Sequence, residues 1–457
     1  MKVSPAKWTR FRITIVFCVF VLACGCIIWR AFQLQVLDRD HLAGKAAREC
    51  QRVIKINPVR GDIFDRRGEK LAVSLEADSI FADPTEVEAK DAAAAKLAGI
   101  LGLNRRSIAK KLKSKTSFVW LKRQVPPGEA ARVAALNLKG IGSLKESKRF
   151  YPNKQLAAQV LGFTGVDAQG LEGLEIMYEE YLRGGVNSWL VKQDALRRTF
   201  LDRNTASPQG LRGAGLTLTL DRRIQYVTEK ALNRAVKKYG ALGGLALVVR
   251  PRTGEILASA VAPGYNPNAF RRYSPSRRRN RILTDTFDPG STFKIFLVAA
   301  ALEEGLVRPR DLVFCENGAY TVDRRVIHDH HDYGWLTVNK VIKYSSNIGA
   351  VKIGEMLGPA RLYSYLDRFG FGRRTGIDLA GESPGRMRPY KRWRNLDAAN
   401  VAFGQGVSVT ALQMVMAMSA LANDGLLMRP YIVSEITDSS GRVIKKTQPE
   451  IIQRVIS

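Results

Sequence analysis

Ser291 and Lys294 stand three residues apart, an arrangement that could carry out nucleophilic acyl transfer. Pro289-Gly290 precedes them, and an uninterrupted apolar run from Ile295 to Leu302 follows. A serine hydroxyl attacks poorly at neutral pH unless a nearby base removes its proton, and lysine is such a base only when burial or a neighbouring charge lowers its pKa. Because residues three apart share one face of a helix, the pattern predicts Ser291 at a helix start with the Lys294 ammonium beside its hydroxyl.

A second motif, Ser345-Ser346-Asn347, offers a hydroxyl and an amide ahead of another apolar helix. Each motif is weak alone, because most S-x-x-K pairs are an exposed helix start with a solvated lysine, and the second motif also fits an ordinary helix N-cap after Tyr344. Their occurrence in this order, each before an apolar helix, indicates a serine acyl-transfer site. The candidate catalytic residues are Ser291, Lys294, Ser345 and Asn347.

The chain resembles the penicillin-binding proteins, whose signature combines S-x-x-K, S-x-N and K-T-G. Other stretches extend the resemblance over nearly the whole chain, in the order of the class B, monofunctional branch. These stretches are Arg60 to Gly68 (RGDIFDRRG), Arg149 to Pro152 (RFYP), Asn280 to Gly290, and Phe403 to Gly406 (FGQG). Asp288 stands where the family more often has glutamate. The compact pedestal and the stretch from His328 to Ser345 look more like septal, division-associated members than like elongation members.

The third family motif has no counterpart in the sequence, which contains neither Lys-Thr-Gly nor Lys-Ser-Gly. The nearest triplets, Arg252-Thr253-Gly254 and Arg374-Thr375-Gly376, are interpreted as turns. In the family this motif lies on a central strand beside the nucleophile and brings an oxyanion-hole N–H. We therefore expect the sequence to be part of a longer protein. We also expect residues 1–457 alone not to bind penicillin measurably, because an incomplete sheet cannot position the oxyanion donors.

The resemblance implies an α+β protein in four parts. These are a cytoplasmic tail (1–12), a single transmembrane helix (13–34), an elongated, non-catalytic α+β pedestal or dimerisation domain (35–210), and a transpeptidase domain (211–457). The last is expected to be an antiparallel sheet flanked by helices, as in serine β-lactamases, without its C-terminal strands. Local patterns add detail: Asp83-Pro84 predicts the start of an alanine-rich helix to Leu101, and 245–249 with 255–261 predict a β-hairpin.

The charge and the N-terminal segment point to a membrane. The formal net charge is +30, which in a soluble protein would raise nucleic-acid binding, but no nucleic-acid motif accompanies it. Ile13 to Trp29 contain no charged residue, and Lys2, Lys7, Arg10 and Arg12 precede them. This pattern predicts a single-pass anchor in the cytoplasmic membrane with the N-terminus inside and the catalytic part in the periplasm. A cleaved signal peptide is disfavoured because no small-x-small site follows. Lipidation at Cys24 is the minority alternative.

Cysteine and histidine usage gives no strong sign of a disulfide or metal. Cys18, Cys24 and Cys26 fall inside the predicted anchor, and Cys50 and Cys315 are interpreted as unpaired thiols. The cluster from His328 to Asp332 contains zinc-ligand types, but five consecutive residues cannot all converge on one ion. We interpret it as a loop near the active site, and the arginine-rich run 271–279 as a solvated loop.

The resemblance implies a D,D-transpeptidase that cross-links peptidoglycan and needs no metal or organic cofactor. Ser291 would attack the penultimate D-alanine of a stem peptide, Lys294 would accept its proton, Ser345 would pass a proton to the leaving D-alanine, and Asn347 would hold the donor amide. β-Lactams would trap Ser291. Implied partners are stem peptides, nascent glycan strands, the membrane, a polytopic glycosyltransferase and division proteins, but no nucleic acid.

Two other classes stay open at this point. One is a D,D-carboxypeptidase or β-lactam-responsive relative, since such proteins share the first two motifs. The other is a non-catalytic membrane scaffold, which the sequence favours only if the gene itself lacks the third motif.

Overall fold

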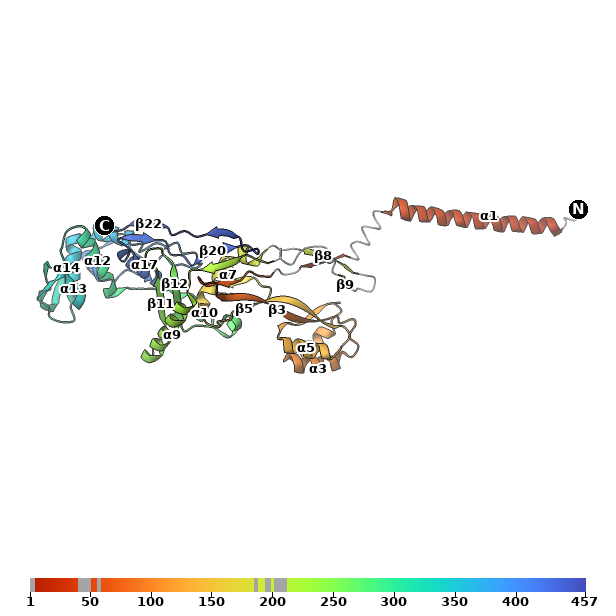
Figure 1. Ribbon diagram of the computed structural model, residues 1–457, viewed down its shortest axis with the longest axis horizontal. Coiled ribbons are helices and arrows are strands. Elements are labelled where there is room, and N and C mark those ends of the chain that lie inside the picture. Colours follow the sequence, from red (N-terminus) through yellow and green to blue (C-terminus); the bar gives the residue numbers. More distant parts are fainter. Residues whose placement is uncertain (1–4, 40–50, 56–58, 185–187, 194–198, 201–211) are drawn as a thin grey trace. The chain divides into compact units, whose positions relative to one another are not determined.

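The computed structural model describes residues 5–39, 51–55, 59–184, 188–193, 199–200 and 212–457 (Figure 1). The chain divides into two compact units. One comprises Met1–Ile56 with Val186–Pro208, and the other comprises Asn57–Gly185 with Gln209–Ser457. The second unit contains both candidate catalytic motifs.

The first unit contains a long N-terminal helix, α1 (Pro5–Phe32), which continues as a π-helical turn, η1 (Gln33–Leu37). The stretch Ile13–Leu37 has 25 residues and a mean hydropathy of 2.4. At 1.5 Å per residue it is long enough to cross a membrane. Three short strands form an antiparallel sheet in the same unit: β1 (Gln51–Lys55), β8 (Ser188–Gln193) and β9 (Thr199–Phe200). The cysteines of α1 are free, and Cys50 lies outside the described residues.

The N-terminal half of the second unit consists of a sheet and small helices. Its elements are β2 (Ile63–Phe64), β3 (Lys70–Ala82), α3 (Lys90–Leu101), α4 (Arg105–Leu112), β4 (Val119–Val125), α5 (Pro127–Ala135), β5 (Ile141–Phe150), α6 (Ala158–Leu161), β6 (Phe163–Thr164), β7 (Gly170–Glu172), α7 (Gly173–Met177) and α8 (Glu179–Arg183). The long strand β3 pairs antiparallel with β4 and β5. Helices α3, α4 and α5 share a separate apolar core with these strands, built around Leu97, Ile108 and Leu121.

The predicted start of the alanine-rich helix is wrong by about two turns, because α3 begins at Lys90 rather than after Asp83. The Asp83 carboxylate does accept a hydrogen bond two residues on, from Thr85 N at 2.9 Å. That bond closes a local turn that does not continue into a helix, and α3 starts only at Lys90.

The stretch that begins at Arg60 is anchored in the interior by ion pairs to distant segments. The Arg60 side chain is 1% exposed and its guanidinium donates to the carboxylates of Glu175 and Glu179. Arg149 Nε donates to Glu175 Oε1 at 2.6 Å, and Tyr151 Oη donates to the same oxygen at 3.1 Å. These contacts connect segments more than 100 residues apart in sequence through one buried carboxylate.

The C-terminal half of the second unit contains the remaining elements. They are β10 (Gly215–Leu218), α9 (Arg222–Tyr239), β11 (Gly244–Val249), β12 (Ile256–Ala262), η3 (Pro267–Arg272), α10 (Pro275–Arg278), α11 (Arg281–Thr284), β13 (Thr286–Phe287), η4 (Gly290–Phe293), α12 (Lys294–Glu303), β14 (Leu312–Phe314), η5 (Glu316–Gly318), β15 (Ala319–Val322), β16 (Arg325–His328), β17 (Trp335–Thr337), α13 (Val338–Tyr344), α14 (Asn347–Leu357), α15 (Pro359–Arg368), η6 (Tyr390–Arg392), α16 (Asn395–Ala402), β18 (Val409–Thr410), α17 (Ala411–Leu421), β19 (Leu426–Met428), β20 (Val433–Thr437), β21 (Val443–Lys446) and β22 (Ile451–Arg454).

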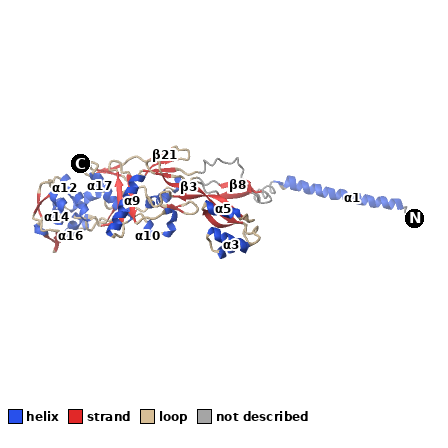
Figure 2. Ribbon diagram, turned by 60° about the horizontal axis from the view of Figure 1, so that its bottom comes forward, coloured by secondary structure: helices blue, strands red, loops and turns tan. Residues whose placement is uncertain are grey.

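The two halves of this unit share one sheet. Strand β10 pairs parallel with β2 and antiparallel with β20, giving the order β21-β20-β10-β2-β3-β4 with β5 also on β3. The predicted hairpin is present as the antiparallel pair β11 and β12. Helices α12, α14, α16 and α17 gather in the same region (Figure 2) around a continuous apolar core. The α+β class predicted from the sequence is therefore confirmed.

Candidate active site

Ser291 lies in a tight turn that leads into a buried helix. The turn η4 spans Gly290–Phe293, and α12 begins at Lys294, so Ser291 sits just before the helix as the motif predicts. The Ser291 side chain is exposed, whereas Phe293 is 1% exposed and its ring lies 4.8 Å from that of Phe371. The buried Phe293 ring thus holds the turn in place, while Ser291 itself is exposed.

A second loop supports the approach to Ser291. Gly290 N donates to Gly404 O at 2.9 Å, and a Cβ placed on Gly404 would lie 2.1 Å from Gly290 O. Asp288, the departure from the family pattern, accepts long hydrogen bonds of 3.3 Å from Gly406 N and from Ser408 Oγ. The turn at Gly290 and the loop at Gly404 therefore pack backbone against backbone, and no side chain fits at position 404.

Lys294 connects the two motifs. Its side chain is 1% exposed, and Nζ donates to Ser345 O at 2.6 Å, Ser345 Oγ at 3.1 Å and Asn347 Oδ1 at 2.9 Å. Burial lowers the pKa of the ammonium to about 8, and the Asp329 carboxylate opposes this shift. Within the part of the chain that the structure describes, its hydrogen bonds go to the second motif and none goes to the Ser291 hydroxyl.

The second motif spans a break between two helices. Ser345 ends α13 in a left-handed conformation with φ 57° and ψ 40°, which is uncommon for a residue with a side chain. Ser346 is the N-cap of α14 and its Oγ accepts from Gly349 N at 2.8 Å. The N-cap interpretation of the motif is therefore correct for Ser346. Its neighbours Ser345 and Asn347 are the residues that meet Lys294.

Asp329 is a site residue that the motif analysis did not single out. Its Oδ1 accepts from the backbone N–H groups of Asn347 and Ile348, the latter at 3.1 Å, and its Oδ2 accepts from Ser346 Oγ at 2.6 Å. Asn347 Nδ2 donates to His328 O at 3.0 Å. The histidine-rich segment is thus a loop that holds the start of α14. The available sequence signal was its acidic character ahead of the S-x-N motif.

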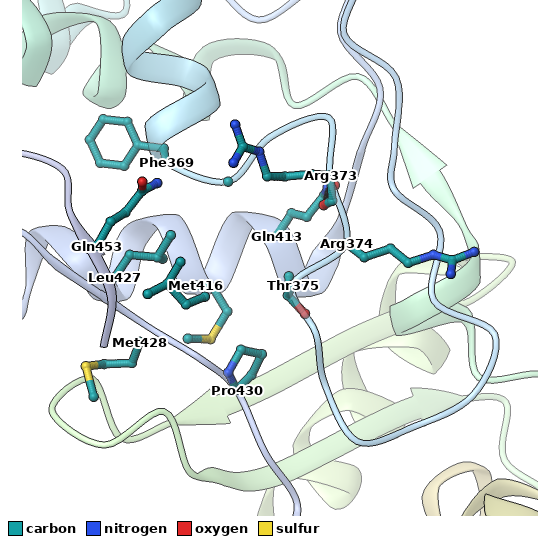
Figure 3. Close-up of a pocket in the computed structure, with 12 residues that line it drawn as sticks. Phe369, Arg373, Arg374, Thr375, Gln413, Met416, Leu427, Met428, Pro430 and Gln453 are labelled. Atoms are coloured by element: carbon teal, nitrogen blue, oxygen red, sulfur yellow. Dashed lines mark hydrogen bonds between the residues drawn. The ribbon is translucent and has the colours of Figure 1, made fainter. Parts of the chain in front are cut away.

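A separate cavity of about 50 Å³ lies between α17, the loop at 373–375, and strands β19 and β22 (Figure 3). Gln413, which lines it, donates through Nε2 to Arg373 O at 2.8 Å and to Pro384 O at 2.9 Å. Among the described residues, its lining includes none of the four candidate catalytic side chains. We interpret this small cavity as a packing gap.

Comparisons with known proteins match nearly the whole chain. A family model of the penicillin binding protein transpeptidase domain matches residues 244–457, and a model of the penicillin-binding protein dimerisation domain matches residues 55–218. The chain is 35% identical over 455 residues to "Probable peptidoglycan D,D-transpeptidase PbpC" of Pseudomonas aeruginosa, covering 98% of this chain and 79% of that protein. It is 34% identical over 433 residues to peptidoglycan D,D-transpeptidase FtsI of Escherichia coli, covering 91% and 72%.

Solved structures give the same answer for the fold. Penicillin binding protein 3 of Mycobacterium tuberculosis, in complex with aztreonam, matches with a TM-score of 0.66 and 27% identity, covering 88% of this chain and 72% of that one. A peptidoglycan synthetase of Bifidobacterium adolescentis matches with a TM-score of 0.67 and 28% identity, covering 89% and 79%.

Proposed function

Because this chain belongs to the class B penicillin-binding proteins, we propose that it is a peptidoglycan D,D-transpeptidase whose nucleophile is Ser291. The single observation that supports this assignment best is the buried Lys294. With a pKa of about 8, a fraction of the Lys294 side chains is neutral near physiological pH and can accept a proton. Lys294 is the first residue of α12, three positions after Ser291. Ser291 is also an exposed residue, as a nucleophile that meets a peptide substrate has to be.

The proposed reaction uses the four residues in sequence. Ser291 Oγ attacks the carbonyl carbon of the penultimate D-alanine while neutral Lys294 accepts the hydroxyl proton. The peptide C–N bond then breaks, and the nitrogen of the terminal D-alanine receives that proton from Lys294 through Ser345. This step frees D-alanine and leaves an ester on Ser291. The Asn347 side chain holds the amide of the donor peptide.

A second stem peptide completes the reaction. Its amine attacks the ester carbonyl, the bond to Ser291 Oγ breaks, and the amine proton returns to Ser291 through Lys294. The products are the cross-link and free enzyme. β-Lactams carry a strained cyclic amide in place of the donor peptide bond. When Ser291 attacks it, the ring C–N bond breaks, the ring nitrogen takes the proton, and the whole antibiotic stays on Ser291 as an ester that blocks the second step.

We also propose the placement of the protein in the cell. Residues 1–12 lie in the cytoplasm, 13–34 form the anchor, 35–210 form the pedestal, and 211–457 form the transpeptidase domain in the periplasm. Lys2, Lys7, Arg10 and Arg12 support this orientation because basic residues favour the cytoplasmic side. The resemblance to septal members supports work at the division site beside a polytopic glycosyltransferase and division proteins.

Labelling with a fluorescent penicillin tests the function. The protein is produced from its own gene in its native membrane, and wild type is compared with Ser291→Ala. We expect wild type to be labelled and Ser291→Ala to lose the label completely. Ser107→Ala is the matched control, since Ser107 and Lys110 repeat the S-x-x-K spacing on α4 with both side chains exposed. A labelled Ser291→Ala protein would contradict the assignment.

A further inference from the structure

The start of α14 is held by a residue outside the three family motifs. Asp329 lies in the loop after β16, 17 residues before Ser346, and its two oxygens accept three hydrogen bonds from that helix start. A carboxylate at this place satisfies two otherwise unpaired N–H groups and meets the positive end of the helix dipole. The first turn of α14 therefore depends on this loop.

The same loop sets the orientation of the Asn347 amide. Asp329 binds the Asn347 backbone N–H, and the preceding residue, His328, accepts from Asn347 Nδ2 at 3.0 Å. Because Nδ2 faces His328 O, Oδ1 is left to accept from Lys294 Nζ at 2.9 Å. Removing Asp329 would release the backbone from which this amide projects.

We propose that Asp329 is a positioning residue of the acyl-transfer site, which fixes Asn347 against Lys294 and supplies the negative charge beside which Lys294 gains and loses its proton. This inference rests on the proposed function, because it concerns the base of that reaction. Asp329 itself touches neither the nucleophile nor the reacting atoms. It acts by holding Ser346 and Asn347 through hydrogen bonds and by the effect of its negative charge on Lys294.

Among the charged and titratable groups around Asp329, its own carboxylate is the one that compensates the positive charge of Lys294. From α12 comes Lys294 itself. From the segment after β14 comes Cys315, whose thiol pKa is raised chiefly by burial, so the thiol is neutral. From α14 comes Lys352, whose Nζ is already paired with Glu316. The remaining groups are exposed: His328 is the last residue of β16, and His330, His331 and Asp332 belong to the loop that follows.

The sign of the effect follows from the charges. Burial disfavours the charged ammonium and lowers the pKa of Lys294, whereas the Asp329 carboxylate favours the ammonium and opposes the shift. The attacking form of the site needs neutral Lys294, so acylation rises with pH through this pKa. Without the Asp329 charge the pKa falls further, and the rise in rate moves to lower pH.

The test is the pH profile of acylation by a fluorescent penicillin in the full protein, from about pH 6 to about pH 10. Asp329→Asn keeps an acceptor for the helix N–H groups and removes the charge. We expect the midpoint of the rise to move toward acid by roughly one pH unit. Asp332→Asn removes an exposed charge from the same loop and should leave the midpoint in place. A midpoint in Asp329→Asn equal to that of wild type would overturn the inference.

Asp329→Glu keeps the inference testable if Asp329→Asn does not fold. It retains the charge but moves it by one methylene, so the midpoint should stay while acylation slows as Asn347 shifts. Unchanged acylation in Asp329→Glu would also overturn the inference. Failure of the proposed function looks different, because wild type would then carry no label on Ser291 at any pH.

Discussion

At the scale of single residues, Lys294 is held firmly as a buried ammonium and can still lose its proton, two properties that rarely occur together. A buried ammonium is costly unless its donors are satisfied, and here three oxygens from Ser345 and Asn347 accept from Nζ. Burial nevertheless lowers its pKa to about 8. The side chain is thus fixed in place when charged and able to lose a proton near neutral pH.

Lys294→Arg separates these two roles. Arginine keeps the charge and the donors but does not lose a proton in proteins, so it cannot serve as the base. We expect acylation by a fluorescent penicillin to fall by about 10²- to 10⁴-fold. The control is Lys352→Arg on α14, a lysine that pairs with Glu316 and should tolerate the change. Acylation within a few-fold of wild type in Lys294→Arg would exclude lysine as the base.

At the scale of elements, the turn that carries the proposed nucleophile, Ser291, packs against the loop that contains Gly404. Strands β13 and β18 pair through Thr286 and Thr410. The Gly290 N–H donates to Gly404 O. Gly404 and Gly406 both have positive φ, 79° and 75°. They differ in their surroundings, because a Cβ at 406 would meet nothing within 4 Å while one at 404 would strike Gly290.

Gly404→Ala and Gly406→Ala form a matched pair. Both changes carry the backbone cost of a side chain at positive φ, about 1 kcal/mol. Only Gly404→Ala forces the turn that carries Ser291 to move, and we expect acylation to fall by about a hundredfold in that variant. Rates are compared below the melting temperature of both proteins. Equal rates in the two variants would mean that the contact at Gly290 does not position the nucleophile.

At the scale of the second unit, one buried carboxylate joins distant segments. Glu175 is 0% exposed and accepts from Arg60, Arg149 and Tyr151, while Asp65 and Arg67 of the same N-terminal block contact the start of α9. A buried ion pair is weak evidence for net stability, but removing one partner leaves charge uncompensated in the interior. Arg60 and Arg149 would each lose a carboxylate partner, and Arg60 would keep only Glu179.

Glu175→Ala should therefore destabilise the protein by about 3–5 kcal/mol. We expect a fall of several degrees in the melting temperature, measured by circular dichroism on the detergent-solubilised chain. Glu180→Ala removes an exposed carboxylate from α8 and should change the free energy of unfolding by no more than about 0.5 kcal/mol. A Glu175→Ala protein as stable as Glu180→Ala would show that the network contributes nothing to stability.

The sequence was a good guide where the controlling interactions are local. Helices α12 and α14 and the turn before Ser291 could be predicted from short apolar runs and from the Pro-Gly and Ser-Ser pairs that precede them. The start of α3 was missed because an Asx turn at Asp83 and a helix N-cap make the same local bond. Asp329 was missed because its partners lie 17 to 19 residues further on. The hydrogen bonds of Lys294 to the second motif, rather than to Ser291, likewise depend on packing between α12 and α14.

Mass spectrometry of the β-lactam adduct tests the central claim most directly. Trypsin cuts after Arg281 and Lys294, which gives the peptide ILTDTFDPGSTFK with Ser291 as its single serine. After reaction of the protein produced from its own gene with a penicillin, we expect this peptide to carry the intact antibiotic mass, with fragment ions that place it on Ser291. An adduct on another residue, or an unmodified peptide after complete labelling of the protein, would contradict the account.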